Sequence, residues 1–259
     1  MSLRHIAIKT SCALFARPPL RKFWSNVSLA SRYFEGLGSG SSIERSGELG
    51  VIDRVVSDPG IPKVFFDVGA NVGDYTTRLL SRCPSARIFA VDASPFAVTE
   101  LKNRFTNNEN VKNDGLGLSD KVETLTLRSP EKASGVATFH EHLGEDIAAF
   151  STVECTTLDG YCETSGINKI GLLKVDVEGH ELSVLKGAVR MLDAGAIHAI
   201  QFDGGAAIAS RIFFHDFWDL LRTRNYKISR VLPFGLAPID RYSERDEVCL
   251  PTIYFAERT

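Results

Sequence analysis

Short apolar segments alternate with helical segments along most of this chain, and no other feature restricts its fold as strongly. The apolar segments carry the β-branched and aromatic residues typical of strands, and they cover residues 63–68, 87–92, 111–118, 122–127, 170–177, 199–202, 227–232 and 252–256. The helical patterns cover residues 75–82, 95–105, 181–192 and 213–222. This order predicts a doubly wound, mostly parallel α/β sheet. The last two strands have no helix between them, which predicts an antiparallel strand at the sheet edge.

Composition and charge exclude several classes of protein. No stretch approaches the roughly 18 uncharged apolar residues that span a bilayer, so we expect no transmembrane segment. The 30 Lys and Arg residues against 32 Asp and Glu give a net charge of -2, which is untypical of a dedicated nucleic-acid-binding protein. The five cysteines include no C-x-x-C pair, which favours reduced thiols and a cytoplasmic location.

The first 34 residues differ in charge from the rest of the chain. They contain six basic residues and no acid, a charge of +6, whereas the remaining 225 residues carry 24 bases and 32 acids, a charge of -8. Glycine and serine dominate residues 36–42, which is typical of a flexible linker. We therefore divide the chain into a basic leader with its linker, 1–45, and one globular domain, 46–259. The leader suits a targeting segment, a helix packed on the domain, or an arm that makes peripheral contact with a membrane or another polyanion.

A glycine-containing turn between the first strand and the first helix of the domain is the most informative motif. It runs Asp67-Val-Gly69-Ala70-Asn71-Val-Gly73, and turns in this context commonly bind a cofactor. Glycine permits a sharp turn at 69 and close packing at 73. The dinucleotide fingerprint G-x-G-x-x-G is incomplete because position 71 is asparagine. An acid at position 67 would repel a phosphate and suits a cofactor with a cationic end, which indicates S-adenosyl-L-methionine rather than NAD.

Polar residues also end the second and third strands. Asp92 closes the second strand, where an acid in this architecture accepts hydrogen bonds from a ribose diol. Capping of the next helix is the alternative role, and Ser94 is better placed for it. Asn113, Asp114 and Gly115 lie at the same sheet edge and predict contacts with an adenine, although the turn chemistry of Asx-Gly explains them about as well.

A pair of carboxylates follows the most apolar segment of the chain. Residues 170–177 form a near-continuous apolar run, as expected of a buried central parallel strand. Asp176 and Glu178 lie on one side of an extended chain at the carboxyl end of that strand, where open α/β sheets bind their ligands. Two like charges held together raise the pKa of one carboxyl, so we predict a functional pair rather than a solvated loop.

These motifs, in this order, resemble those of the FkbM-type methyltransferase family of the class I S-adenosylmethionine-dependent superfamily. The resemblance extends over about residues 64–202 and rests on residues 67–73, 92–95, 156–159, 173–181 and 185–188. It implies a seven-stranded, Rossmann-like sheet and O-methylation of a hydroxyl on a saccharide, glycolipid or related natural product. Family members commonly have Glu where this chain has Asp92, but the shorter carboxylate still reaches a diol.

The resemblance also implies roles for individual residues. Asp67, Gly69, Asn71 and Gly73 would hold the methionine part of the cofactor, Asp92 the ribose, and Asp176 would lie near the transferable methyl. The full predicted cofactor-binding set is Asp67, Gly69, Ala70, Asn71, Gly73, Asp92, Ala93, Asn113, Asp114, Gly115 and Asp176.

A sugar hydroxyl is a weak nucleophile and benefits from a general base. We predict Asp176, Glu178 and His180 as the catalytic group, with His180 and Glu178 competing for the role of base; for His180, an exposed residue at a helix start is the alternative. Carboxylates at 176, 178 and 203 do not by themselves show that they converge, so we assign no metal.

The expected partner is a small-molecule or glycan acceptor rather than a nucleic acid. Two other readings stay open: an NAD(P)-dependent oxidoreductase on a Rossmann-like fold, and a cofactor-binding domain that acts in interactions without catalysis.

Overall fold

The computed structural model describes residues 3–38, 42–130, 137–140, 147–204, 210–248 and 250–259. The chain divides into two compact units, residues 1–38 and 39–259. The first unit consists of α1 (Leu3–Phe15), the 3-10 turn η1 (Pro18–Leu20) and α2 (Arg21–Phe34). Proline cannot donate a backbone hydrogen bond, so the Pro18-Pro19 pair separates the two helices. Across the described part of the chain, no helix is long and apolar enough to cross a membrane.

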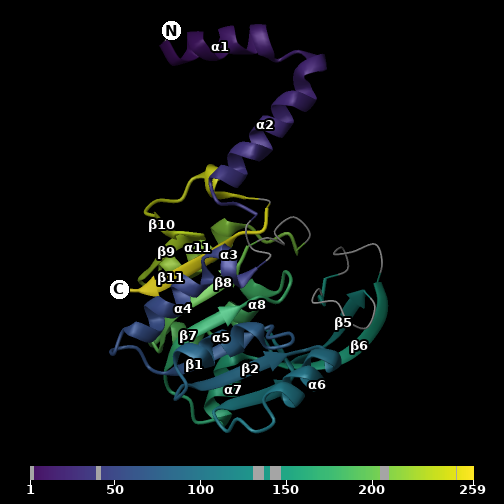
Figure 1. Cartoon of the computed structure of the whole chain (residues 1–259), viewed down its shortest axis with the longest axis vertical. Coiled ribbons are helices and arrows are strands. Elements are labelled where there is room, and N and C mark those ends of the chain that lie inside the picture. The colour runs from purple at the N-terminus through teal and green to yellow at the C-terminus, as the bar shows by residue number, and fades with distance from the viewer. Residues whose placement is uncertain (1–2, 39–41, 131–136, 141–146, 205–209, 249) are drawn as a thin grey trace. The chain divides into compact units, whose positions relative to one another are not determined.

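The second unit is built on a large mixed sheet (Figure 1). Its strands are β1 (Val64–Val68), β2 (Arg87–Asp92), β3 (Val111–Gly115), β7 (Ile170–Val175), β8 (Ile197–Asp203), β9 (Tyr226–Leu232), β10 (Gly235–Ile239) and β11 (Ile253–Arg258). Their order is β10-β9-β11-β8-β7-β1-β2-β3. The five strands from β8 to β3 run parallel, whereas β11 is antiparallel to both of its neighbours and β10 is antiparallel to β9.

The predicted doubly wound, mostly parallel sheet is confirmed, with two differences in detail. The described residues form eight strands in this sheet rather than seven, because β10 folds back on β9 as a hairpin. The short β10 contains Pro238, and proline is tolerated in a strand at the edge of a sheet. Because of this proline, the segment lacks the run of β-branched residues that predicts a strand. The predicted strands 227–232 and 252–256 do pair antiparallel, but β11 lies inside the sheet, and the outermost antiparallel strand is β10.

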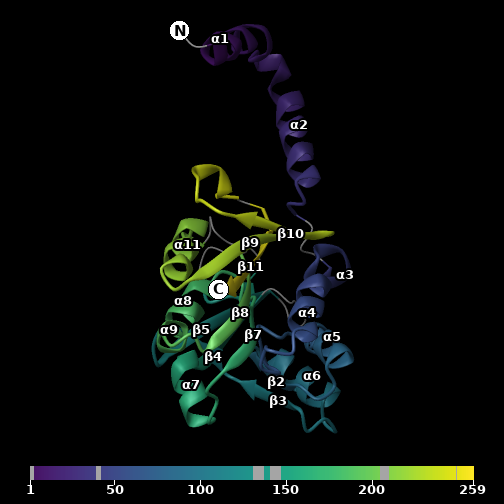
Figure 2. The same ribbon diagram turned by 90° about the vertical axis from the view of Figure 1, so that its left-hand side faces the viewer.

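Helices cover both faces of this sheet (Figure 2). One face carries α4 (Glu48–Ser57), α5 (Asp74–Arg82) and α6 (Pro95–Arg104), with α3 (Ile43–Ser46) preceding them; the other carries α7 (Leu158–Thr164), α8 (Glu181–Lys186), α9 (Val189–Asp193) and α11 (Phe214–Arg222). Successive side chains of a strand point to opposite faces, so Phe65 and Phe66, both fully buried on β1, belong to separate core clusters. A doubly wound sheet thus has two cores.

The segment predicted as one helix over residues 181–192 forms two shorter helices. The chain bends at Gly187, where an added Cβ would lie 2.1 Å from the carbonyl oxygen of Ser119. This close approach to another segment could not be predicted from helical periodicity alone.

A second, smaller sheet stands beside the end of β2. Its strands are β4 (Gly117–Leu118), β5 (Glu123–Pro130) and β6 (Ile147–Thr156), in the order β4-β6-β5. The predicted strand at 122–127 corresponds to β5, whereas β6 was not predicted. Leu127, Val153 and Cys155 form a small core that packs against Ala93 and Phe139, so this sheet closes one side of the region described next.

Candidate active site

The carboxyl ends of β1, β2 and β7 meet at one edge of the large sheet. Gly69 follows β1 with a φ of 75°, and its N–H donates to the carbonyl of Val91 at 2.9 Å. A Cβ at this position would lie 1.8 Å from the carbonyl oxygen of Asp176. Only glycine therefore lets the chain turn this close to the end of β7.

A cavity with an apolar wall opens beside this turn. The wall is formed by Ala93, Phe96, Leu116, Leu118, Phe139 and Val177. Its polar side carries Asp92, which accepts hydrogen bonds from the N–H groups of Asn71 and Ser94, both at 2.8 Å. Burial raises the pKa of Asp92, although these two donors oppose the rise. The carboxylate retains lone pairs for further donors, so it can bind a diol next to an apolar surface.

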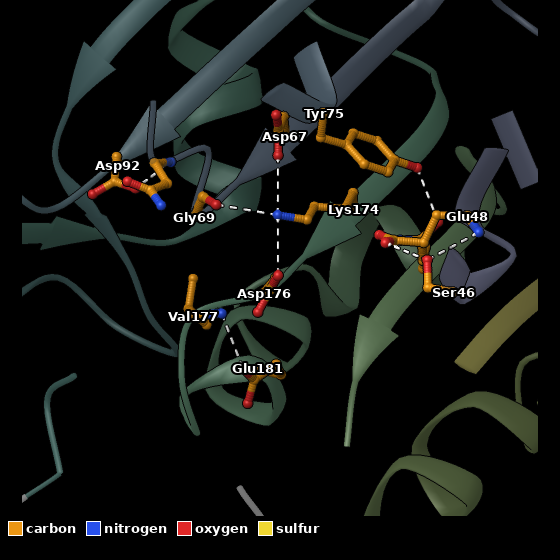
Figure 3. A network of polar contacts seen from close by, with 12 residues as sticks. Ser46, Glu48, Asp67, Gly69, Tyr75, Asp92, Lys174, Asp176, Val177 and Glu181 are labelled. Atoms are coloured by element: carbon orange, nitrogen blue, oxygen red, sulfur yellow. Dashed lines mark hydrogen bonds and ion pairs between the residues drawn. The ribbon is translucent and has the colours of Figure 1, made fainter. Parts of the chain in front are cut away.

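A second cavity of about 260 Å³ adjoins the first, and Gly69, Asn71 and Asp176 line both. Lys174 lies at this junction (Figure 3): its Nζ is 3.2 Å from Asp67 Oδ1 and 3.4 Å from Asp176 Oδ2, and it donates to the Gly69 carbonyl at 3.1 Å. Burial alone would lower the pKa of Lys174, but the neighbouring carboxylates outweigh burial and raise it. The lysine is therefore a buried permanent cation.

Asp67 lines neither cavity. Its side chain is fully buried in β1, where Oδ2 accepts a hydrogen bond from the Thr76 hydroxyl at 2.7 Å and Oδ1 faces Lys174. In this arrangement Asp67 holds Lys174 in place, and its predicted contact with the cofactor stays a prediction.

Helix α4 contributes an acid that sequence analysis missed. Glu48 is 6% exposed and lines the second cavity. It accepts hydrogen bonds from the Ser46 hydroxyl and the Gln201 amide, both at 2.7 Å, and the Tyr75 hydroxyl donates to the same Gln201 at 2.9 Å. Burial raises the pKa of Glu48. An acid in the first turn of a helix is common, so the sequence carried no signal that singled it out.

Glu178 lines the first cavity together with Asp176. Its φ of 52° is in the left-handed region, as is the 48° of Asn71, so two strained non-glycine residues lie at this site. The turn is held by the carboxylate of Glu181, which accepts from the N–H groups of Val177 and Gly179 at 2.9 and 3.1 Å. Burial, reinforced by nearby carboxylates, raises the pKa of Glu178 to about 7, and burial raises that of Glu181 to about 8.

His180 does not line either cavity. The ring is buried, lies edge-on to Phe139 at 5.2 Å between centroids, and has its Nε2 3.1 Å from the Ser119 hydroxyl. Burial, together with nearby His140, lowers the pKa of His180 to about 4, so the imidazole is neutral at pH 7. The site therefore places Glu178, rather than His180, where a ligand would contact it, and a catalytic role for His180 stays a prediction.

The remaining predicted residues are divided between the site and the core. Ala93 lines the first cavity and Ala70 the second. Gly73 packs against α6 and the residue after it, because a Cβ there would lie 2.6 Å from Phe105. Residues 113–115 do not line either cavity; the third-strand side is lined by Leu116, Gly117 and Leu118 instead.

The side chain of Asp114 is engaged elsewhere. It accepts a hydrogen bond from the Tyr161 hydroxyl and forms a 3.0 Å ion pair with Lys112. Within the described residues, no group of three or more His, Cys, Asp or Glu side chains is placed to hold a metal ion.

A doubly wound sheet whose strand ends carry a carboxylate, an apolar wall and a charged cavity has the architecture of a Rossmann-like domain. The methyltransferase FkbM domain matches residues 67–228. The chain therefore belongs to the FkbM methyltransferase family, as its motifs predicted.

Individual relatives are more distant. Over 165 residues the chain is 27% identical to hexuronic acid methyltransferase AglP of Haloferax volcanii. The matched region covers 61% of this chain and 64% of the relative. Over 143 residues it is 25% identical to 2-O-methyltransferase NoeI of Sinorhizobium fredii, covering 50% and 58%. The chain thus matches about three fifths of the length of these curated relatives.

Solved structures include precorrin-6y C5,15-methyltransferase of Geobacter metallireducens, with a TM-score of 0.46 and 10% identity over 87% of this chain and 94% of that chain.

Proposed function

We propose that this protein is an S-adenosylmethionine-dependent O-methyltransferase that acts on a hydroxyl of a saccharide, glycolipid or related natural product. The observation that carries the proposal is the pair of cavities that meet at Asp176. The first cavity suits an adenosine, with Asp92 for the ribose diol and the apolar wall for the base. The second suits the charged amino-acid end of the cofactor. The names of AglP and NoeI, a hexuronic acid methyltransferase and a 2-O-methyltransferase, support a sugar hydroxyl as the acceptor.

When bound, S-adenosylmethionine supplies a methyl group activated by a sulfonium. The residues of this chain bind and orient the cofactor and the acceptor, and one of them accepts a proton from the acceptor hydroxyl. Glu178 lines the first cavity next to Asp176, and its pKa of about 7 suits a general base that takes the proton of the acceptor hydroxyl near neutral pH. The apolar wall excludes water from the same space.

Substituting Asp92 by alanine tests the cofactor assignment. Charge-assisted hydrogen bonds contribute about 1.5–3 kcal/mol each, so we expect Asp92→Ala to weaken binding of S-adenosylmethionine and S-adenosylhomocysteine about 10- to 100-fold in isothermal titration calorimetry. The matched control is Asp240→Ala, which removes an exposed carboxylate and should leave both dissociation constants unchanged.

The same protein, titrated in parallel with NADH, separates the proposal from the oxidoreductase alternative. A ligand at 100 times its dissociation constant stabilises the fold by about 2.7 kcal/mol, which is a thermal shift of about 5–10 °C for a unit of this size. Shifts with the two S-adenosyl ligands support the proposal. A shift with NADH contradicts the proposed cofactor. If Asp92→Ala binds the S-adenosyl ligands as tightly as the control does, the assignment of Asp92 to the cofactor is contradicted.

The thiols support our proposal of a cytoplasmic location. Cys12, Cys83, Cys155 and Cys162 are free, and burial raises the pKa of Cys155 to about 11. A buried protonated thiol is unreactive, and free thiols are typical of proteins in a reducing compartment.

A further inference from the structure

The second cavity holds more negative than positive charge. Its charged lining consists of Lys174 with the carboxylates of Glu48, Asp74 and Asp176, as far as the chain is described. Asp74 has its own partner, a 2.7 Å ion pair with Arg104. Lys174 forms ion pairs with both Asp176 and the buried Asp67.

Glu48 is the lining carboxylate whose own hydrogen-bond donors are neutral. The Ser46 hydroxyl donates to one carboxylate oxygen of Glu48 (Figure 3). The Gln201 amide donates to the other oxygen, and the Tyr75 hydroxyl donates to Gln201 in turn. Neutral donors orient the carboxylate but add no positive charge, and Glu48 is buried. The nearby cation is Lys174, whose charge also acts on Asp67 and Asp176. A buried carboxylate with this environment is stabilised by a cation that enters the cavity.

We infer that Glu48 binds the ammonium of the cofactor's amino-acid end. This inference rests on the proposed function and deepens it. Asp67, the motif acid predicted for this role, has Thr76 on one oxygen and Lys174 at the other and lines neither cavity. The recognition acid therefore comes from α4, outside the matched family segment of residues 67–228, and α4 becomes part of the cofactor site.

The test compares three ligands by titration calorimetry with the full chain. S-adenosylmethionine and S-adenosylhomocysteine carry the amino-acid end, whereas 5′-methylthioadenosine carries the adenosine and the sulfur alone. Glu48→Gln keeps the side-chain volume and removes the charge. It should weaken the first two ligands about 10- to 100-fold, the range for a lost charge-assisted hydrogen bond, and leave 5′-methylthioadenosine within about twofold.

Two variants and the ligand set keep the outcomes distinct. Glu109→Gln, at an exposed position that lines neither cavity, is the matched control and should bind all three ligands as the unmodified protein does. Glu48→Asp keeps the charge and should recover part of the lost affinity for the first two ligands. This variant separates the loss of charge from any disturbance of folding in Glu48→Gln. Equal loss of all three ligands in Glu48→Gln, or loss of none, overturns the inference while the proposed function stands. If the unmodified protein binds none of the three, the proposed function itself fails and the inference with it.

The first unit carries an independent inference, from the surface of α2. Phe23, Val27, Ala30 and Phe34 recur at intervals of four, three and four residues, so they form one stripe of the helix. The exposed fractions of Phe23 and Phe34 are 56% and 90%.

The opposite stripe of α2 is basic and polar. It carries Arg21, Ser25, Ser28 and Arg32 at the same intervals. Arg21 also lines a groove of about 740 Å³ at the corner of α1 and α2, whose other walls include Phe15, Arg17 and Trp24.

We propose that residues 3–34 bind the surface of an anionic phospholipid bilayer. A helix with one apolar stripe, aromatic side chains and only basic charges suits the boundary between headgroups and acyl chains. The +6 charge of residues 1–34, without one acid, complements an anionic surface and gives no complementarity to a second copy of the same segment.

Co-sedimentation of the full chain tests this proposal, with vesicles of phosphatidylcholine alone or mixed with phosphatidylglycerol. Each basic residue at an anionic surface contributes a factor of about five, so Arg21→Gln with Arg32→Gln should weaken binding to the mixed vesicles about 25-fold. Lys169→Gln with Lys227→Gln, two exposed lysines of the second unit, is the matched control and should bind like the unmodified protein. Equal binding to both vesicle types overturns the proposal, and so does an arginine variant that binds like the control. A third variant, Phe23→Ser with Phe34→Ser, removes the apolar stripe. If it changes self-association and leaves vesicle binding unchanged, the proposal is also overturned.

Discussion

Glu178→Gln is expected to lower kcat by a factor of about 10² to 10⁴, the usual contribution of a general base. Glutamine has nearly the volume of glutamate but cannot accept the proton of the acceptor hydroxyl. Asp92, rather than Glu178, is the carboxylate that we propose for the ribose. The dissociation constant for S-adenosylhomocysteine should therefore change by less than about threefold in Glu178→Gln. Single-turnover methyl transfer to a sugar acceptor measures the effect, and Glu109→Gln, an exposed glutamate, is the control.

The pH dependence gives this prediction a second readout. The base acts when ionised, and its pKa is raised to about 7, so kcat of the unmodified protein should rise about tenfold per pH unit below 7 and level off above it. In Glu178→Gln this rise should disappear. A variant that retains normal kcat and the same pH profile would show that the base lies elsewhere, and a variant inactive because it fails to bind S-adenosylhomocysteine would assign Glu178 a binding role. Retained binding with lost methyl transfer also argues against a purely interaction-based role for the domain.

Lys174→Met is expected to destabilise the second unit by about 3–5 kcal/mol, the cost of leaving a buried carboxylate without its partner. Lys174 has a 7% exposed side chain and lies between Asp67, fully buried, and Asp176. Methionine fills a similar volume, so most of the loss is electrostatic. For a unit of about this size the melting temperature should fall by about 6–20 °C, and urea unfolding followed by circular dichroism measures the free energy.

A second substitution separates charge from packing. Asp67→Asn in the Lys174→Met background removes the stranded charge and should recover a substantial part of the lost stability, whereas independent sites would add their losses. Lys186→Met, at an exposed position of α8, should stay within about 0.5 kcal/mol of the unmodified protein. If Lys174→Met matches that control, the ion pairs of Lys174 with Asp67 and Asp176 contribute nothing to stability.

Patterns between residues close together in the sequence predicted most strands of the large sheet and two acids that line the first cavity. The apolar run at residues 170–177 became β7, buried throughout, because a central parallel strand contacts helices on both faces. Ser94 caps α6, accepting from the N–H of Ala97, as the Ser-Pro pair predicted. Asp92 and Glu178 were predicted because a polar residue at the carboxyl end of a strand lies at the ligand edge of such a sheet, and both line the first cavity.

The wall and the charges of the site were not predicted, because they depend on segments far apart in the chain. The small sheet of β4, β5 and β6 supplies Leu118 and helps close the first cavity, although β6 has a mixed sequence with no clear alternation. Lys174 did carry a signal, since a lysine inside an apolar strand is buried only when paired, but its partners could not be named.

The sequence alone determined the alternation of strands and helices in the parallel part of the large sheet, the turn at Gly69 and the family, because these depend on local periodicity, backbone freedom and an ordered set of motifs. Only the tertiary structure decided which acids line the two cavities. It turned Asp67 toward Thr76 and Lys174, buried His180 beside Ser119, and brought Glu48 of α4 to the second cavity. A side chain's direction and its compensating charge are set by neighbours across the fold, and no spacing along the chain encodes them.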